Sequence, residues 1–205
     1  MIGSELTIQL LVLRFFAGLI IVTVQGATLA GVAVLLGDQG PRHDRRLTVM
    51  PFGHIDLLGL GSLVLTGFGW GKPVAIDAEQ LRYGRWGLVL AVLASSLALL
   101  AVGYLILFLV IPLLTLLPYT TGIGAAAFVR VAARLCVWMA LFTLVPLPPL
   151  AGAHLLDAMG IRLPPAANMV IGIVLLVGSL LGVTRTVLTP LYSLIAPLIL
   201  GIDLS

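Results

Sequence analysis

Two pairs of residues in this sequence are of types that could bind a metal ion or move a proton. His54 is followed by Asp56, and His154 is followed three residues later by Asp157. Zinc accepts imidazole and carboxylate ligands. The sequence contains no H-x-x-x-H spacing, however, which would place two imidazoles on one face of a helix. We therefore expect hydrogen-bonded, structural roles for all four residues, with a polar pair between His154 and Asp157. A metal site made from the four, or haem or chlorophyll ligation by either histidine, is the alternative.

The elements that must position these residues are apolar. The chain has 205 residues, of which 60% are hydrophobic and 9% are charged, whereas a soluble domain carries about 25% charged residues. Too few polar side chains remain to cover a surface that faces water, so we expect an integral membrane protein with lipid as a partner. The hydrocarbon core takes about 20 apolar residues per helix. This length therefore allows five or six crossings, and nothing in the net charge of +3 indicates nucleic-acid binding.

Continuous apolar runs predict an all-α fold in a single transmembrane domain, residues 1–205. We expect crossings near residues 8–36, 52–71, 86–117 and 125–144, followed by C-terminal helices within residues 165–205. Six glycines loosen residues 52–71, which could cross or re-enter, and their length favours a crossing. Residues 47–51 carry β-type side chains and predict a short extended segment.

A proline-broken segment interrupts the apolar sequence between residues 144 and 157. Its prolines are Pro146, Pro148 and Pro149, and proline breaks a helix because it lacks a backbone donor. Non-helical backbone at membrane depth persists only where protein or a water-filled cavity satisfies it. This segment could therefore receive a helix or strand of another chain. Gly67 and Gly71 have the G-x-x-x-G spacing that permits close helix contact.

Three motifs, in this order, resemble the site-2-protease-like intramembrane metalloproteases. LLGDQGPRHDRRLT (residues 35–48) has the family's spacing between its catalytic helix and an extended segment. LTVMPFGHIDLLG (47–59) with GFGWGKPVAID (67–77) is similar to the stretch that follows that helix. LVPLPPLAGAHLL (144–156) is similar to the family's proline-rich motif. The resemblance implies a site-2-protease-like core over about residues 8–158.

The family's chemistry implies a zinc ion held by the two histidines of H-E-x-x-H on a helix and by an aspartate of the proline-rich motif, while the glutamate activates water. The resemblance places these four groups at Gln25, Gly26, Leu29 and Ala151. Glycine and leucine cannot bind zinc, and none of the four residues can act as a base. We therefore predict a non-catalytic pseudoprotease with no enzymatic activity, no metal and no cofactor.

The predicted function is that of a structural or accessory subunit that binds other integral membrane proteins. We expect a hetero-oligomeric respiratory or photosynthetic complex and a multi-pass protein of the bacterial inner membrane. The structural or partner-binding candidates are His54, Asp56, Pro146, Pro148, Pro149, His154, Asp157, Gly67 and Gly71. A metalloprotease with an unorthodox metal site is one alternative. A small transporter is another, although such pathways normally need ionisable groups inside the membrane.

Overall fold

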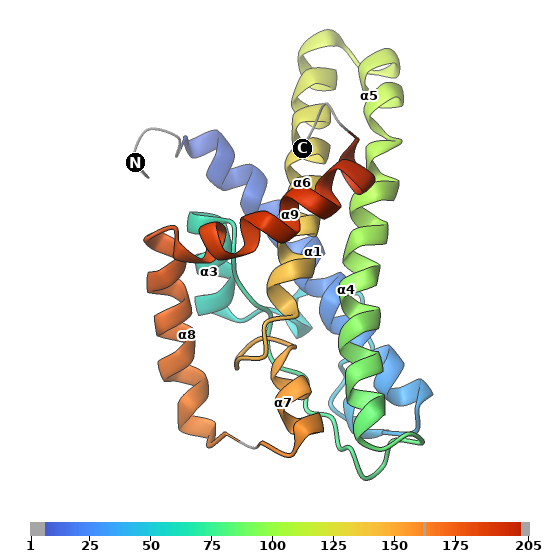
Figure 1. Cartoon of the computed structure of the whole chain (residues 1–205). Helices are drawn as coiled ribbons and strands as arrows, with labels where there is room; N and C mark the ends of the chain where they lie inside the picture. The colour runs from blue at the N-terminus through green and yellow to red at the C-terminus, as the bar shows by residue number, and fades with distance from the viewer. Residues whose placement is uncertain (1–6, 162, 202–205) are drawn as a thin grey trace.

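The computed structural model describes residues 7–161 and 163–201, and this part of the chain is helical without a strand. Its elements are α1 (Ile8–Leu35), α2 (Gly40–His43), the 3₁₀ turn η1 (Pro51–Gly53), α3 (Leu57–Thr66), α4 (Arg85–Leu107), α5 (Val110–Leu116), α6 (Tyr119–Thr143), α7 (Ala153–Met159), α8 (Pro165–Leu180) and α9 (Val183–Leu200). The centre of the bundle is formed by α1, α4 and α6, which all pack against one another (Figure 1). The all-α prediction is confirmed for these residues.

Within the described residues, four helices are long and apolar enough to cross a membrane. They are Ile8–Leu35, Arg85–Leu116, Tyr119–Thr143 and Val183–Leu200. The apolar helices Leu57–Thr66 and Ala166–Leu180 are shorter. At 1.5 Å per residue they extend only about 15 and 22 Å, less than the roughly 30 Å of the hydrocarbon core. Four spans are therefore supported, and the five or six that we expected stay a prediction.

Residues 52–71 turn back instead of crossing, so our preference for a crossing was wrong. The helix α3 ends at Gly67, whose φ of +87° lies in the left-handed region that glycine adopts without strain. The chain then returns to its entry point. The N–H of Lys72 donates to the carbonyl of His54 at 2.7 Å, and Ile55 pairs with Gly71. Length and hydropathy cannot reveal such a closure, because they are the same for a span and for a re-entrant hairpin.

The predicted G-x-x-x-G helix contact is not formed. Gly67 is the C-terminal cap of α3, and Gly71 lies in the extended chain that follows. We call residues 68–74 the return segment. Residues 47–50, where we predicted an extended segment, form no strand, and Met50 has extended backbone angles just before η1.

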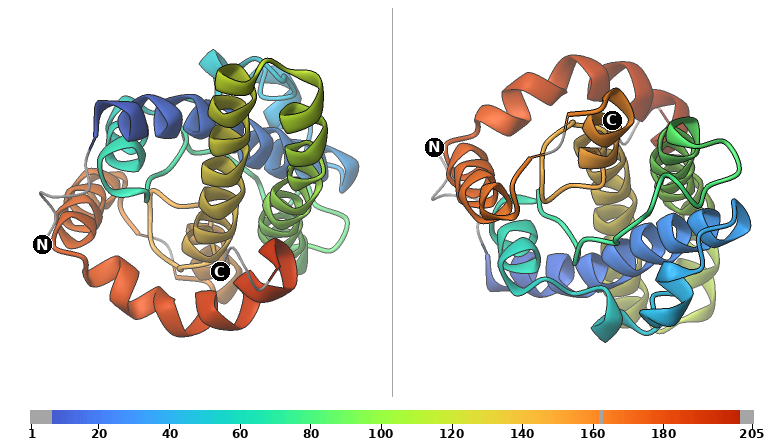
Figure 2. Two further views of the ribbon diagram at one scale, coloured as in Figure 1. Left: turned by 90° about the horizontal axis from the view of Figure 1, so that it is seen from above. Right: turned by 90° about the horizontal axis from the view of Figure 1, so that it is seen from below.

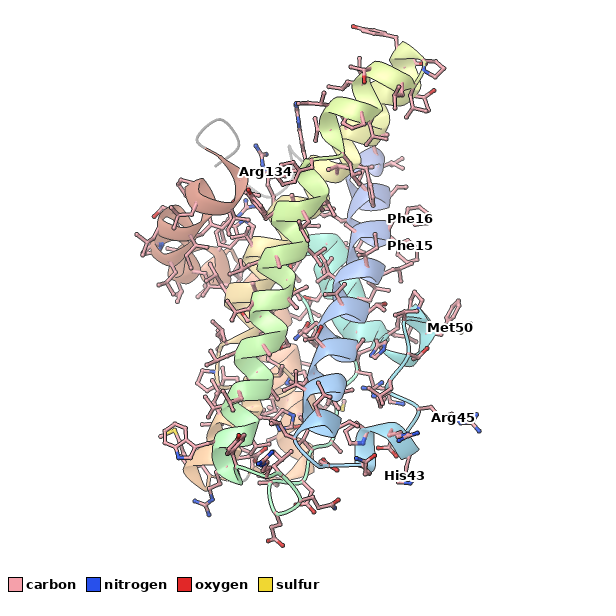
Figure 3. All side chains as sticks on the ribbon, turned by 90° about the vertical axis from the view of Figure 1, so that its right-hand side faces the viewer. Phe15, Phe16, His43, Arg45, Met50 and Arg134 are labelled. Atoms are coloured by element: carbon pink, nitrogen blue, oxygen red, sulfur yellow. The ribbon has the colours of Figure 1, made fainter. Side chains whose placement is uncertain are left out.

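The two polar loops, residues 37–46 and 72–85, lie together at one end of the molecule. The N–H of Arg82 donates to the carbonyl of Leu36 at 2.7 Å, and Asp38 accepts from the N–H of Asp77 at 2.8 Å. Figure 3 shows His43 and Arg45 at this end, far from Arg134. Each loop carries three Lys or Arg residues. Under the positive-inside rule, we expect this end to face the cytoplasm.

The proline-broken segment is enclosed by other parts of the fold. It follows the end of α6 at Thr143 and leads into α7, and Gly152 makes its tight turn possible. A Cβ at Gly152 would lie 2.1 Å from the carbonyl oxygen of Val145. Seen along the bundle, α1, α3, α8 and α9 surround this segment (Figure 2).

The last helix, α9, contains Pro190 and Pro197 without ending at either, and it runs obliquely across α6.

Two glycines of α3 provide a matched test of how the re-entrant hairpin packs. A Cβ at Gly59 would lie 2.1 Å from the carbonyl oxygen of Trp70, whereas a Cβ at Gly61 would meet nothing within 4 Å. We expect Gly59→Ala to lower the free energy of unfolding by about 1–3 kcal/mol through overpacking. Gly61→Ala should be neutral or stabilise by up to about 1 kcal/mol. Denaturant titrations in detergent micelles measure both, and equal effects would contradict the hairpin packing.

Candidate functional site

A cleft with a volume of about 200 Å³ lies between α1, the return segment and the proline-broken segment with α7. One face of α1 lines it with residues at helical spacing, namely Val22, Gln25, Gly26 and Leu29. The opposite wall is formed by Pro148, Pro149, Leu150, Ala151, His154 and Asp157. The cleft therefore brings together all four positions that the family resemblance assigned to zinc chemistry. Of the candidate residues, Pro146, His54, Asp56 and Gly67 do not line it.

His54 fills the space beside Gly26. A Cβ at Gly26 would lie 2.3 Å from His54 Nδ1, so no larger residue fits while the ring keeps its place. The imidazole is fully buried, and its Nε2 is 2.8 Å from the carbonyl oxygen of Thr48. Burial lowers the pKa of His54; the Thr48 carbonyl opposes this effect and Arg46 reinforces it. The ring is therefore neutral at pH 7, and its Nε2–H donates to Thr48 while Nδ1 is left as an acceptor.

Buried acceptor atoms without a described hydrogen-bond partner gather around the cleft. They are Gln25 Oε1 and, beside Gly26, His54 Nδ1. Leaving such a group unpaired costs about 1–3 kcal/mol. Gln25 is only 6% exposed, so its oxygen has lost most of its contact with bulk water and has no replacement donor among the described residues. The site therefore favours a ligand that presents N–H or O–H groups.

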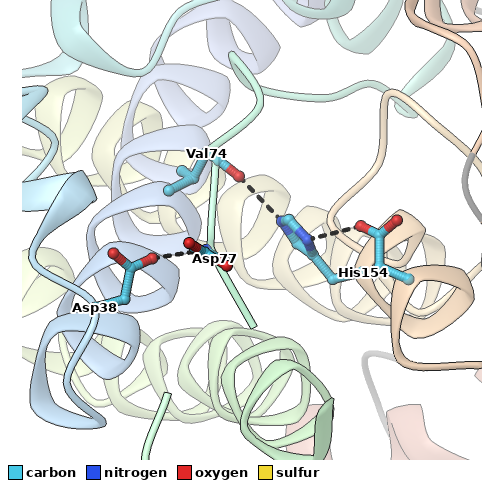
Figure 4. Close-up of polar contacts among 5 residues, drawn as sticks. Asp38, Val74, Asp77 and His154 are labelled. Atoms are coloured by element: carbon cyan, nitrogen blue, oxygen red, sulfur yellow. Dashed lines mark hydrogen bonds and ion pairs between the residues drawn. The ribbon is translucent and has the colours of Figure 1, made fainter. Parts of the chain in front are cut away.

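His154 ties α7 to the return segment and closes one side of the cleft. Its Nε2 lies 3.0 Å from the carbonyl oxygen of Val74, and its Nδ1 lies 3.4 Å from Asp157 Oδ2 (Figure 4). The two side chains thus form a polar pair one helical turn apart. Asp56 has a different role, because its Oδ1 accepts from the N–H of Gly59 at 2.8 Å and caps α3.

Arg46 is a structural residue of the site that the sequence analysis missed. Its buried guanidinium donates to the carbonyl oxygens of Gly53, Lys72 and Pro73, the last at 2.8 Å. The return segment therefore has its carbonyls occupied from within the protein. The signal that could have indicated this role is the position of Arg46 directly before the LTVMP motif, since a polar loop alone suggests only a solvated charge.

The chain is 31% identical over 133 residues to a protein of Bacillus subtilis (strain 168) named "Putative zinc metalloprotease YwhC". The name of that relative describes a hydrolase. The matched region covers 62% of this chain and 60% of the relative, so the chain spans less than two thirds of that protein. No protein-family model matches the chain, and no solved structure matches it. The match supports the resemblance to site-2-protease-like membrane proteins that the three motifs indicated.

The prediction that the protein is not an enzyme is contradicted by this similarity. It rested on the residue types at Gln25, Gly26, Leu29 and Ala151, which were assigned by counting from a motif. Such counting identifies positions that share a cleft. It does not decide whether other groups in the same cleft support a reaction.

The described residues do not fit a zinc ion, the metal in the relative's name. In residues 7–161 and 163–201, no three His, Cys, Asp or Glu side chains lie together in a group that could hold a metal. His154 and Asp157 are adjacent, but His54 and Asp56 point to other partners. A zinc site needs three or four protein ligands. The described residues therefore support no reaction step through zinc.

The contact between Gly26 and His54 can be tested with a double-mutant cycle. Gly26→Ala should lower the free energy of unfolding by about 1–3 kcal/mol, because its Cβ collides with the imidazole. The same change in a His54→Ala background should cost less, with a coupling of about 0.5–3 kcal/mol. Denaturant titrations of the four proteins in detergent measure the coupling. Purely additive effects would show that the ring does not occupy this space.

Proposed function

We propose that this protein binds an extended polypeptide segment of another integral membrane protein in the cleft. The observation that carries the proposal is the buried Gln25 Oε1, an acceptor on the cleft wall without a described partner. On the facing wall, the carbonyls of Pro148 and Pro149 accept no hydrogen bond from any described residue. An extended chain presents N–H groups at regular spacing and can supply donors to such a wall.

The remaining cleft wall suits an apolar segment. Val22, Leu29, Trp70 and Leu150 contribute hydrophobic surface, and Lys72 with Asn168 adds polar groups. Apolar side chains of a membrane protein can therefore pack here while their backbone pairs with the acceptors. In this proposal the protein is a multi-pass protein of the bacterial inner membrane and contacts its partner within a larger membrane complex. The similarity to a bacterial protein supports the bacterial setting.

A photoreactive amino acid in the cleft tests the binding. We expect position 151 to cross-link to a peptide from an apolar segment of another membrane protein when the full chain is purified in mild detergent. Mass spectrometry identifies the adduct. Adding Gln25→Leu should reduce the adduct about tenfold, because it removes the acceptor without changing the bulk greatly. The control position is Leu97, an exposed residue of α4 outside the cleft. Adducts to lipid alone at position 151 would contradict the proposal.

Hydrolysis of the bound segment is a second candidate function, and the similarity to the relative favours it. It predicts cleavage of a membrane-inserted substrate in proteoliposomes that contain the purified protein. His154→Ala should abolish cleavage, and the conservative His54→Gln should preserve more of it, because His54 lies outside the cleft lining. Elemental analysis of the same samples measures bound zinc. If a membrane segment that cross-links to position 151 is not cleaved in proteoliposomes, this candidate is excluded. The binding proposal would still stand.

A further inference from the structure

Lys72 is the only lysine in the sequence, and it lines the cleft. It lies in the return segment, two residues after Trp70 and two before Val74. Alternate residues of an extended chain project to the same side. Trp70 and Val74 are buried residues of the cleft lining, whereas the Lys72 side chain is exposed. The return segment therefore presents a single cation to the cleft from a wall that is otherwise apolar.

The contacts of the return segment with α1 place Lys72 at membrane depth. A Cβ at the preceding residue, Gly71, would lie 3.4 Å from Val22 Cβ. Val22 is 16 residues before Asp38, which lies at the end of the molecule formed by the polar loops. This separation is about 24 Å along the helix, within the roughly 30 Å of a hydrocarbon core. Lys72 thus begins the second polar loop but lies well inside the bundle.

No carboxylate in residues 7–161 and 163–201 forms an ion pair with Lys72. Asp157 lines the same cleft, but its Oδ2 lies 3.4 Å from His154 Nδ1. Behind the return segment, Arg46 adds a second positive charge and donates to the backbone carbonyls of Lys72 and Pro73. Charged side chains inside a membrane pair with an opposite charge or mark a site for a ligand. The chemistry that suits Lys72 is therefore that of an anion entering the cleft.

We propose that the cleft prefers a membrane segment with an Asp or Glu side chain, which pairs with Lys72. This inference rests on the proposed function, because it names the chemistry of the segment that the cleft binds. An ammonium donates charge-assisted hydrogen bonds to a carboxylate, and their attraction is stronger where the segment has displaced water. Both groups are costly in hydrocarbon when unpaired, so pairing favours the complex. The backbone of the segment faces Gln25 and the prolines, and its acidic side chain faces the return segment.

Three synthetic segments, each long enough for one membrane span, test this preference. They share a Leu and Ala sequence and an amidated C-terminus, and they carry Glu, Gln or Lys at the central position. Fluorescence anisotropy measures their binding to the full chain in detergent micelles. We expect the Glu segment to bind about tenfold more tightly than the Gln segment, and the Lys segment to bind most weakly, because only Glu complements the ammonium.

Variants of the protein show whether Lys72 causes the preference. Lys72→Met should abolish it, and Lys72→Arg, which keeps the charge, should retain most of it. The matched control is Arg82→Gln, which removes a positive charge from a residue outside the cleft lining. This control should leave the preference unchanged. A preference that falls equally in Lys72→Met and Arg82→Gln would overturn the proposal, because net charge would then explain it.

A carbodiimide provides a second measurement, because it joins an amine to a carboxylate in contact with it. An amide bond forms between the two groups, and the carbodiimide leaves as its urea. We expect an adduct between Lys72 and the Glu segment, which mass spectrometry locates. Lys72→Arg should lose this adduct and keep its affinity, whereas Lys72→Met should lose both. An adduct that is missing while the Glu segment is bound would contradict the pairing.

The same probes separate this inference from the proposed function. If the Glu and Gln segments bind equally well and both cross-link to a photoreactive residue at position 151, the pairing with Lys72 is overturned and binding in the cleft stands. If no segment binds, or none cross-links at position 151, the proposed function fails and this inference fails with it.

Discussion

His54 lies where three parts of the chain meet, and its contacts determine the shape of the cleft. Its ring packs on Gly26 of α1, its Nε2–H donates to Thr48, and its backbone carbonyl accepts from Lys72. The same residue therefore closes the re-entrant hairpin and fixes that hairpin against α1. Since the ring is buried and neutral, these contacts do not depend on a counter-charge. The return segment becomes one wall of the cleft as a direct result.

The two walls of the cleft differ in how their backbone groups are satisfied. On the return segment, carbonyls are bonded by Arg46 and His154. Side chains thus replace the water that a non-helical segment would otherwise need at membrane depth. On the proline-broken wall, the carbonyls of Pro148 and Pro149 accept no backbone hydrogen bond from a described residue. In the proposed complex, the incoming chain would therefore find its acceptors on the proline side and on Gln25.

The sequence predicted the parts of this fold that depend on composition and local pattern. Low charge and long apolar runs indicated an all-α membrane protein, and the span expected at residues 86–117 matches Arg85–Leu116 closely. The hairpin was missed because its closure joins His54 to Lys72, a pairing that hydropathy does not encode. The contact between Gly26 and His54 was missed for the same reason, since 28 residues separate them. The prediction that the protein is not an enzyme was wrong for another reason. It rested on the residue types at four single positions, whereas the similarity of the longer sequence is to a protein named as a zinc metalloprotease.

The re-entrant course of residues 52–71 also affects how the chain enters a membrane. Because the hairpin returns to its own side, both basic loops stay together, and in the orientation that the positive-inside rule favours neither would have to be translocated. In that orientation, the connection between α5 and α6 would instead pass to the far side. Residues 105–124, which contain that connection, include no Asp, Glu, Lys or Arg. Moving charge through hydrocarbon is the main cost of translocation, so this uncharged connection would be cheap for the insertion machinery to move.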